Sequence, residues 1–357
     1  MAQVMTGSFF MALALGVCVM TLAVIGLSRL APRLGLMDTP SVRKTHARPV
    51  PVTGGLALFV SLLTVSALWS DQWPVFVWPL MAGGLLLVAV GVFDDVFELS
   101  PQWRFLAQAL AIILVVALSG ESIGTFGFLL SGQWPVDLGW LAVPVTVFGV
   151  IGVINAVNMA DGIDGLAASL VLVGLSLLWV MVPDPAWRRW LVLLGVLLLV
   201  FLVANLAGGR RQVFLGDAGS AFLGFVLAWL VVHFSQGEYR RIYPVTALWL
   251  LALPVFDTIF VMTQRLLAGR SPFAPDRCHV HHLLLRRGYS PRKALLVLVV
   301  YALILAQTGW LMLHYQVPEH WQFYAFVALS GVYYVMIRRG WRQVGDACFP
   351  DRSGQAS

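Results

Sequence analysis

The chain has 357 residues, of which 59% are hydrophobic and only 11% are charged, and its net charge is +6. A soluble domain carries about 25% charged residues, so this composition excludes an ordinary soluble fold. The basic balance fits loops that face an anionic membrane surface. No RNA- or DNA-binding motif is present in the sequence, so nucleic acid is not expected as a partner.

Long apolar runs follow one another along almost the whole chain. A helix needs about 20 apolar residues to cross the hydrocarbon of a bilayer, and these runs show none of the alternation expected of membrane strands. The sequence therefore predicts an all-α polytopic integral membrane protein with about eleven transmembrane helices, or ten if one interrupted run does not span. The predicted spans are 8–30, 52–70, 74–93, 103–119, 138–157, 165–182, 188–206, 219–235, 244–264, 294–315 and 320–338.

The Lys and Arg residues predict the orientation of these spans. With the N-terminus outside, 19 of the 23 Lys and Arg residues fall on the inner side, and only Arg188, Arg189, Arg240 and Arg241 fall outside. The positive-inside rule then predicts the N-terminus outside and the C-terminus inside. We expect a single transmembrane domain over residues 1–340 and a short polar cytoplasmic tail over 341–357.

Acidic residues gather at the predicted inner ends of the spans. Asp94 and Asp95 directly follow the apolar run 85–93, and two adjacent carboxylates repel each other unless a cation or a proton lies between them. A pair of solvated acids that ends a helix is the alternative interpretation. Asp257 lies inside a predicted span, where an ionisable residue indicates a functional site and Arg265 is a candidate partner.

Two further motifs carry acids at the same membrane face. Four polar residues are spaced by threes, which places them on one face of a helix, and the glycines among them indicate that the helix breaks. Another acid lies in a glycine-rich turn before an apolar span, and a helix that begins after such a turn suits phosphate binding. The first set is Asn155, Asn158, Asp161 and Asp164, and the second acid is Asp217, in the turn 214–220.

The longest inner loop, 265–293, contains a cluster of basic and histidine side chains that can hold phosphate oxygens through charge-assisted hydrogen bonds. A zinc site that uses the histidines and Cys278 is the alternative, although the acids elsewhere favour a hard cation with oxygen ligands. No disulfide is expected, because Cys278 and Cys348 face a reducing compartment. The cluster consists of Arg277, His279, His281 and His282.

The first inner loop adds Asp38, Lys44 and His46, followed by a glycine pair at 54–55 that we expect to be flexible. A plain positive anchor is the alternative for this loop. Several carboxylates, amides and basic groups on one face are the parts needed to hold Mg²⁺ and a diphosphate. The sequence contains no GxxxxGK[ST] motif, which argues against an ATP-driven pump. A transporter of an anionic solute is the alternative of another class, but transporters place their sites near the midplane.

These motifs, in this order, resemble the polyprenyl-phosphate N-acetylhexosamine-1-phosphate transferases, and the resemblance covers about residues 30–295. The sequence His-Val-His-His at 279–282 is similar to the WecA-type branch, which uses UDP-N-acetylglucosamine (UDP-GlcNAc). The muramoyl-pentapeptide branch has three consecutive histidines, which Val280 interrupts here, and a Lys where this chain has Glu98.

The resemblance implies an enzyme of the bacterial inner membrane that faces the cytoplasm. It would transfer GlcNAc-1-phosphate from UDP-GlcNAc to undecaprenyl phosphate, giving undecaprenyl-diphosphate-GlcNAc and UMP, with Mg²⁺ or Mn²⁺ as cofactor. Another UDP-acetamido sugar or UDP-MurNAc-pentapeptide is the alternative donor. The polymer could be a lipopolysaccharide O-antigen, a common antigen or a teichoic acid of the cell wall, and a homodimer is compatible with the family.

The resemblance also implies roles for individual residues. Whether Asp94 attacks covalently or only aids direct attack by the lipid phosphate stays open, and we favour direct attack because this phosphate is already largely anionic near pH 7. Asp217 and Asn158 resemble the metal ligands, and Asp164 and Phe214 resemble the residues that bind uracil. Asp94, Asp95 and Asp161 resemble the catalytic acids, of which the first two would bind or deprotonate the lipid phosphate or assist the metal. The other substrate-binding candidates are Asp38, Lys44, His46, Arg277, His279, His281 and His282.

Overall fold

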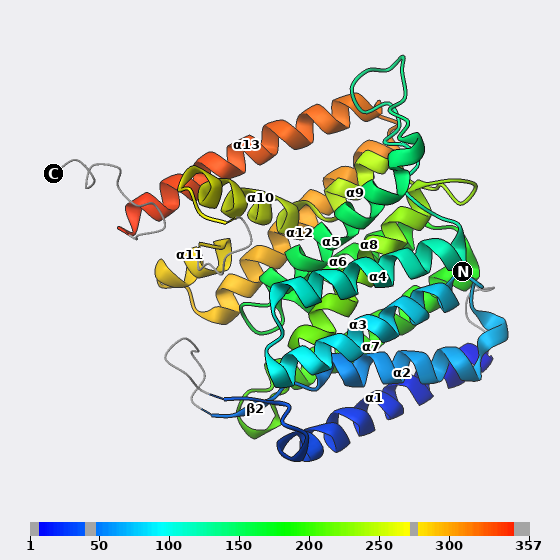
Figure 1. Cartoon of the computed structure of the whole chain (residues 1–357), viewed down its shortest axis with the longest axis vertical. Coiled ribbons are helices and arrows are strands. Elements are labelled where there is room, and N and C mark those ends of the chain that lie inside the picture. Colours follow the sequence, from blue (N-terminus) through cyan, green and yellow to red (C-terminus); the bar gives the residue numbers. More distant parts are fainter. Residues whose placement is uncertain (1–6, 40–47, 272–277, 346–357) are drawn as a thin grey trace.

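The computed structural model describes residues 7–39, 48–271 and 278–345, and helices account for most of them (Figure 1). The only sheet in these residues is a pair of two-residue antiparallel strands, β1 and β2. The elements are α1 (Gly7–Leu34), β1 (Met37–Asp38), β2 (Val50–Pro51), α2 (Gly54–Leu68), α3 (Val77–Phe97), α4 (Pro101–Ser119), α5 (Ala142–Ala160), α6 (Leu166–Met181), α7 (Pro185–Leu206), α8 (Gly216–Ser235), α9 (Pro244–Leu250), α10 (Ala252–Leu267), α11 (Val280–Arg286), α12 (Pro291–His314) and α13 (Glu319–Gln343).

The expected all-α polytopic architecture is confirmed. Within the described ranges, seven helices are long and apolar enough to cross a membrane: α1, α3, α4, α5 with its preceding turn, α7, α8 and α12. The pair α9 and α10, bent by 81°, makes an eighth if it counts as one span. Helices α2 and α6 are apolar but shorter, with 15 and 16 residues. Each of the eleven predicted runs contains a helix, and the count of eleven and the orientation stay predictions.

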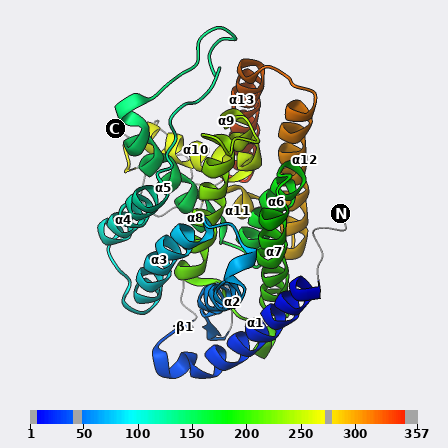
Figure 2. The same ribbon diagram turned by 90° about the vertical axis from the view of Figure 1, so that its right-hand side faces the viewer.

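Helix α8 forms the centre of the bundle. It is apolar over nearly its whole circumference, which is typical of a helix enclosed by other helices, and almost all of its side chains are buried. Helices α2, α3 and α5 pack around it, as Figure 2 shows from the end where α1 begins. Because α8 starts at Gly216, this packing also determines where Asp217 lies.

Glycines bring the backbones of α2 and α3 into direct contact with the first turn of α8. A Cβ atom on Gly55 would lie 2.1 Å from the Cα of Gly219, and one on Gly91 would lie 2.3 Å from the Cα of Ala218. The expectation of a flexible glycine pair is therefore wrong: Gly54 and Gly55 are buried and begin α2. These positions lack side chains because two helix backbones meet there.

Replacing Gly91 by Ala should destabilise the bundle, although alanine is the better helix former. The added methyl group has to push α3 away from α8, and such overpacking costs about 1–3 kcal/mol. Gly152→Ala on α5 is the matched control, because a Cβ there has no atom within 4 Å. Thermal unfolding in detergent should show a lower midpoint for the first variant only, and equal midpoints would contradict the proposed backbone contact.

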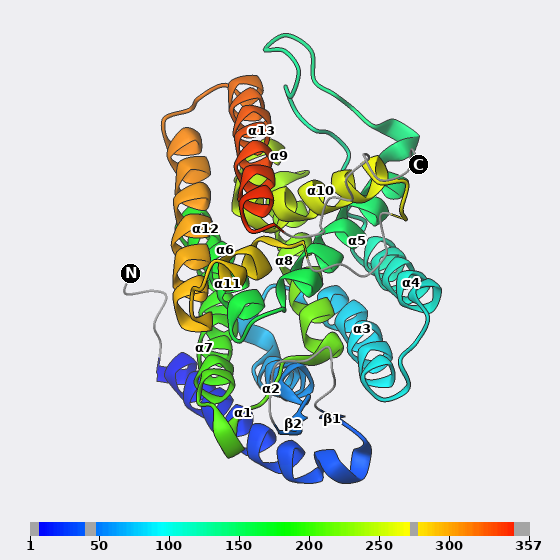
Figure 3. The same ribbon diagram turned by 90° about the vertical axis from the view of Figure 1, so that its left-hand side faces the viewer.

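Helices α10 and α11 lie at one end of the bundle, whereas α12 and α13 run along its length (Figure 1). The break at Leu251 turns α10 away from α9, and Figure 3 shows α11 at this end of the bundle. Helix α13 packs against α9, α10 and α11. It continues to Gln343 and buries Trp341, so the first residues of the expected tail belong to this helix.

Candidate active site

Carboxylates from three helices meet at this end of the bundle. Asp217 lies in the first turn of α8, and its Oδ1 atom accepts a hydrogen bond of 2.8 Å from Nδ2 of Asn158 on α5. Asp94 and Asp95 on α3 and Asp161 after α5 each lie close enough to Asp217 to repel its charge. The motifs that the sequence analysis singled out are therefore brought together in space.

The two neighbouring aspartates of α3 have different environments. Asp95 accepts hydrogen bonds from the backbone N–H groups of Asp217 at 2.9 Å and Ala218 at 3.4 Å. These N–H groups belong to the first turn of α8 and have no partner within their own helix. A carboxylate at a helix N-terminus is also favoured by the helix dipole. Asp95 thus caps α8 from a different helix and fixes the orientation of its first turn.

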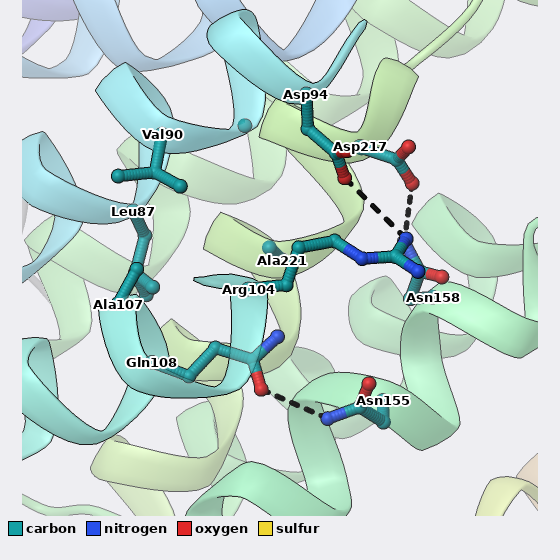
Figure 4. A pocket seen from close by; sticks show the side chains of 11 residues that line it. Leu87, Val90, Asp94, Arg104, Ala107, Gln108, Asn155, Asn158, Asp217 and Ala221 are labelled. Carbon is teal, nitrogen blue, oxygen red and sulfur yellow. Dashed lines mark hydrogen bonds and ion pairs between the residues drawn. The ribbon is translucent and has the colours of Figure 1, made fainter. Parts of the chain in front are cut away.

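Asp94 points the other way, into a small cavity of about 40 Å³ between α3, α4, α5 and α8. Figure 4 shows Arg104 extending from α4 toward Asp94, with 3.4 Å between its Nη1 and the Asp94 Oδ2 atom. Sequence reasoning missed Arg104, because an arginine at a span end is expected for orientation alone. At the other end of the cavity Gln108 accepts a hydrogen bond of 2.9 Å from Asn155.

The walls of this cavity are charged at one end and apolar along one side. Asp94, Arg104 and Asp217 form a charged end, and Leu87, Val90 and Ala107 form an apolar side. A ligand that fits both parts has a charged group joined to an apolar one.

The segment after α5 carries the next two acids. Asp161 has an exposed surface, and the surrounding protein still removes water from its carboxyl. This loss of water, together with the charges of Asp217 and Asp164, raises the pKa of the Asp161 carboxyl to about 7. Asp164 is exposed and accepts a hydrogen bond of 2.8 Å from Nε2 of Gln212.

The described parts of the segment between α1 and α2 reach the site through their backbone. Asp38 on β1 pairs with Val50 on β2. The N–H group of Phe214 donates to the Pro51 carbonyl at 2.8 Å, so β2 lies beside the segment that leads into α8. Lys44, His46 and Arg277, which were predicted to bind substrate, lie outside the described residues.

Residues 278–282, here called the histidine segment, contact the loop after α5 that carries Asp161. The contact is made by His281. His281 is buried, and a Cβ atom on Gly162 would lie 2.1 Å from its Nε2 atom. Burial and the neighbouring His282 lower the pKa of the His281 imidazole to about 3, with a smaller effect of His279, against the opposing charge of Asp257. His281 is therefore uncharged near pH 7 and offers an uncharged hydrogen bond rather than the charge-assisted one expected from the sequence.

The zinc alternative loses its thiolate ligand, because Cys278 is disulfide-bonded. The expectation that no cysteine forms a disulfide is thus wrong for Cys278, whereas Cys18 is free. The compartment alone does not decide whether Cys278 is bonded, because the fold brings the end of α13 to this loop. There Trp341 donates to the Cys278 carbonyl at 3.0 Å.

The donor set at α8 fits a hard divalent cation that shares its coordination with a substrate. In the described part of the chain, no three His, Cys, Asp or Glu side chains are grouped closely enough to hold a metal ion. Mg²⁺ is commonly bound by one or two carboxylates together with water and substrate phosphates. The concentration of carboxylate charge around Asp217, with Asp94, Asp95 and Asp161 nearby, suits this mode of binding.

Known proteins with similar sequences identify the family of this chain. The model of Glycosyl transferase family 4 matches residues 77–235, from α3 to the end of α8. An undecaprenyl-phosphate α-N-acetylglucosaminyl 1-phosphate transferase of Yersinia pestis is 34% identical over 320 residues, which cover 88% of this chain and 87% of that protein. The chain belongs to Glycosyl transferase family 4.

Other family 4 proteins agree with this assignment. The protein of the same name from Haemophilus influenzae is 36% identical over 90% of this chain and 92% of its own length. The one from Escherichia coli K12 is 33% identical over 88% of this chain. This family 4 member is thus a multi-pass membrane phosphoglycosyltransferase related to these enzymes, and its family is typically metal-dependent.

Proposed function

We propose that the chain transfers GlcNAc-1-phosphate from UDP-GlcNAc to undecaprenyl phosphate and releases UMP. The observation that carries this proposal is the cavity beside Asp94 and Asp217, which has a charged end and an apolar side. An isoprenoid phosphate has the same two parts. The names of the relatives support the choice of both substrates.

The donor would bind where α5, α8 and the histidine segment meet. Asp217 and Asn158 would hold Mg²⁺, or Mn²⁺ in its place, and this ion would neutralise charge on the donor diphosphate. Asp164 and Phe214 would bind the uracil ring, next to the loop that carries Asp38. The other donor contacts would come from the histidine segment, and Lys44, His46 and Arg277 remain predicted contacts.

The acceptor would enter from the bilayer along the apolar side of the cavity. Its phosphate would meet the guanidinium of Arg104, which offers several N–H donors suited to a phosphate. Asp94 holds this guanidinium in place by their contact of 3.4 Å. Asp94 and Asp161 border the reacting groups, whereas Asp95 acts through its contact with the first turn of α8.

The proposed reaction is a direct displacement. An oxygen of the lipid phosphate attacks the phosphorus that carries the sugar, and a new P–O bond forms between lipid and sugar phosphate. The bond from this phosphorus to the oxygen bridging to the uridine monophosphate unit breaks, and UMP leaves with the bond's electrons. Because the lipid phosphate is already largely anionic near pH 7, positioning and charge neutralisation by the chain supply most of the effect.

The setting of this reaction belongs to the same proposal. The carboxylates would face the cytoplasm of a bacterium, the N-terminus would lie outside, and the protein would reside in the inner membrane. A homodimer stays a prediction. The concentration of the acids at one end of the bundle favours an enzyme over a transporter, whose site is expected near the midplane.

The test is UMP release by the purified protein in detergent with UDP-GlcNAc, undecaprenyl phosphate and Mg²⁺. Release that requires the lipid phosphate and stops with EDTA is the expected result. Release only with another UDP-acetamido sugar or with UDP-MurNAc-pentapeptide would keep the reaction and change the donor. No release with any of these donors would refute the transferase and favour the transporter.

Replacing Asp95 by Ala should lower both stability and UMP release. Losing a helix cap costs about 1–2 kcal/mol, and here it also loosens the turn that carries Asp217. Asp184→Ala is the matched control, since Asp184 caps α7 by accepting from the Trp187 N–H at 2.9 Å. Both variants should melt earlier, but only Asp95→Ala should lose turnover at a temperature where both are folded. Equal turnover would contradict the proposed role of this cap.

A further inference from the structure

Asp257 on α10 is a buried carboxylate with three hydrogen-bond donors around it. Its Oδ2 atom lies 2.8 Å from Nδ1 of His279. Its Oδ1 atom accepts from the backbone N–H group of Val280 at 2.9 Å and from the hydroxyl of Tyr333 at 2.9 Å. Only 8% of the Asp257 surface is exposed, so these donors take the place of water.

This arrangement fixes the orientation of His279. A carboxylate that accepts from Nδ1 directs Nε2 away from itself. With both ring nitrogens protonated, Nε2 donates to an anion. The His279 ring lies nearly parallel to the ring of His281, with an angle of 4° and 5.7 Å between their centroids. His281 in turn lies against Gly162, next to Asp161. Asp257 is thus connected to the site through two stacked rings.

The C-terminal helix supports the same segment from behind. Tyr333 on α13 holds Asp257, and Trp341 on the same helix donates to the backbone carbonyl that precedes His279. Near the end of α13, the Gln343 side chain accepts a hydrogen bond of 2.8 Å from Arg287, which follows α11. The histidine segment therefore lies between the acids of the site and α13.

We propose that Asp257 and Tyr333 are positioning residues that hold His279 and His281 in the orientation needed to bind the donor diphosphate. This inference rests on the proposed function, because it concerns the donor side of that site. Neither residue is expected to touch substrate, because the Asp257 carboxylate is occupied by His279, Val280 and Tyr333, and the Tyr333 hydroxyl donates to Asp257. Their effect reaches the donor through the two imidazoles.

The alternative is that Asp257 only stabilises the fold. A buried carboxylate is weak evidence for stability, since the cost of removing its charge from water offsets much of what its hydrogen bonds contribute. A structural role also predicts lower stability in the variants without a selective change in donor binding. The two roles can therefore be separated by measuring stability and the two substrates independently.

The first experiment compares Asp257→Asn and Tyr333→Phe in the full-length protein. Asparagine keeps the shape of the side chain but no longer presents an acceptor to both His279 and Tyr333. We expect Asp257→Asn to raise the KM for UDP-GlcNAc about 10-fold or more, and Tyr333→Phe to raise it about 2- to 10-fold. The KM for undecaprenyl phosphate should not change. Calorimetric titration with UDP-GlcNAc should give the same loss of donor affinity without the acceptor.

Tyr334→Phe is the matched control for Tyr333→Phe. Tyr334 is the next residue of α13, and its hydroxyl contacts Gln264 on α10 instead of Asp257. Its removal deletes one hydroxyl from the same pair of helices and should leave the KM for UDP-GlcNAc at the wild-type value. An equal increase in both tyrosine variants would overturn the proposal.

A double-mutant cycle tests whether Tyr333 acts through Asp257. In the Asp257→Asn background, Tyr333→Phe should add almost nothing to the donor KM. Independent, additive effects would overturn the proposed connection. A wild-type protein that releases UMP, with variants that melt earlier but bind UDP-GlcNAc normally, would overturn the positioning role alone. A wild-type protein that neither binds UDP-GlcNAc nor releases UMP would refute both this inference and the proposed function.

Discussion

Replacing Asp217 by Asn is expected to lower the rate of UMP release by roughly 100- to 1000-fold, the range seen when one preorganised charge-stabilising group is removed. Asparagine has nearly the same size and still accepts the hydrogen bond from Asn158 that now reaches Oδ1. The variant therefore keeps the local packing and loses the negative charge. Since that charge would hold Mg²⁺ against the donor diphosphate, catalysis should fall while the fold persists.

The measurement is the initial rate of UMP release over a range of Mg²⁺ concentrations, together with the thermal unfolding midpoint. Asp71→Asn is the control, because Asp71 is exposed in the short turn between α2 and α3, at the opposite end of the bundle. It should show the wild-type rate. If Asp217→Asn retained more than about a tenth of the wild-type rate at saturating Mg²⁺, Asp217 could not be a ligand on which catalysis depends.

Replacing Arg104 by Gln is expected to raise the KM for undecaprenyl phosphate by about 10- to 100-fold, which corresponds to the loss of one hydrogen bond between charged groups. Arg104 is 40% exposed and borders the cavity at its charged end. Glutamine still reaches the cavity but brings no positive charge to the lipid phosphate. The KM for UDP-GlcNAc should change little, because the proposed donor contacts lie on α5, α8 and the histidine segment.

Rates should be measured against the mole fraction of acceptor in mixed micelles. Arg292→Gln is the matched control, since Arg292 is an exposed cation in the first turn of α12. It removes the same charge from the same end of the bundle without touching the cavity. An acceptor KM that rises equally in both variants would mean that general attraction to the anionic lipid, and not a contact with Arg104, explains the effect.

Much of the site could be predicted from the sequence because its acids lie in short motifs. Asn158 and Asp161 are close in the chain, and Asp217 lies at a glycine-rich helix start, so a local pattern suffices to find them. Their convergence was expected because the predicted topology assigns these loops to one membrane face. The structure confirms the helical architecture at each predicted run, although α13 is not among the helices that are apolar enough to span by composition.

The contacts that could not be predicted are those between residues far apart in the chain. Asp257 and Tyr333 are 76 residues apart, and the sequence analysis assigned no role to Tyr333. The two aspartates of α3 are neighbours with different partners, because one faces α8 and the other faces α4. The prediction that the glycine pair 54–55 is flexible was wrong. A missing side chain indicates flexibility in a loop, but inside a bundle it indicates close backbone contact.

Two kinds of contact hold the two parts of the site, and they differ in how easily the sequence can change there. Asp217 is placed by backbones that admit no side chain between them, so this region tolerates almost no sequence change. The histidine segment depends on side chains of α10 and α13, which can be exchanged in compatible sets. New donor preferences should therefore evolve by coordinated replacement of this segment and the helix behind it, while the chemistry at α8 is inherited unchanged.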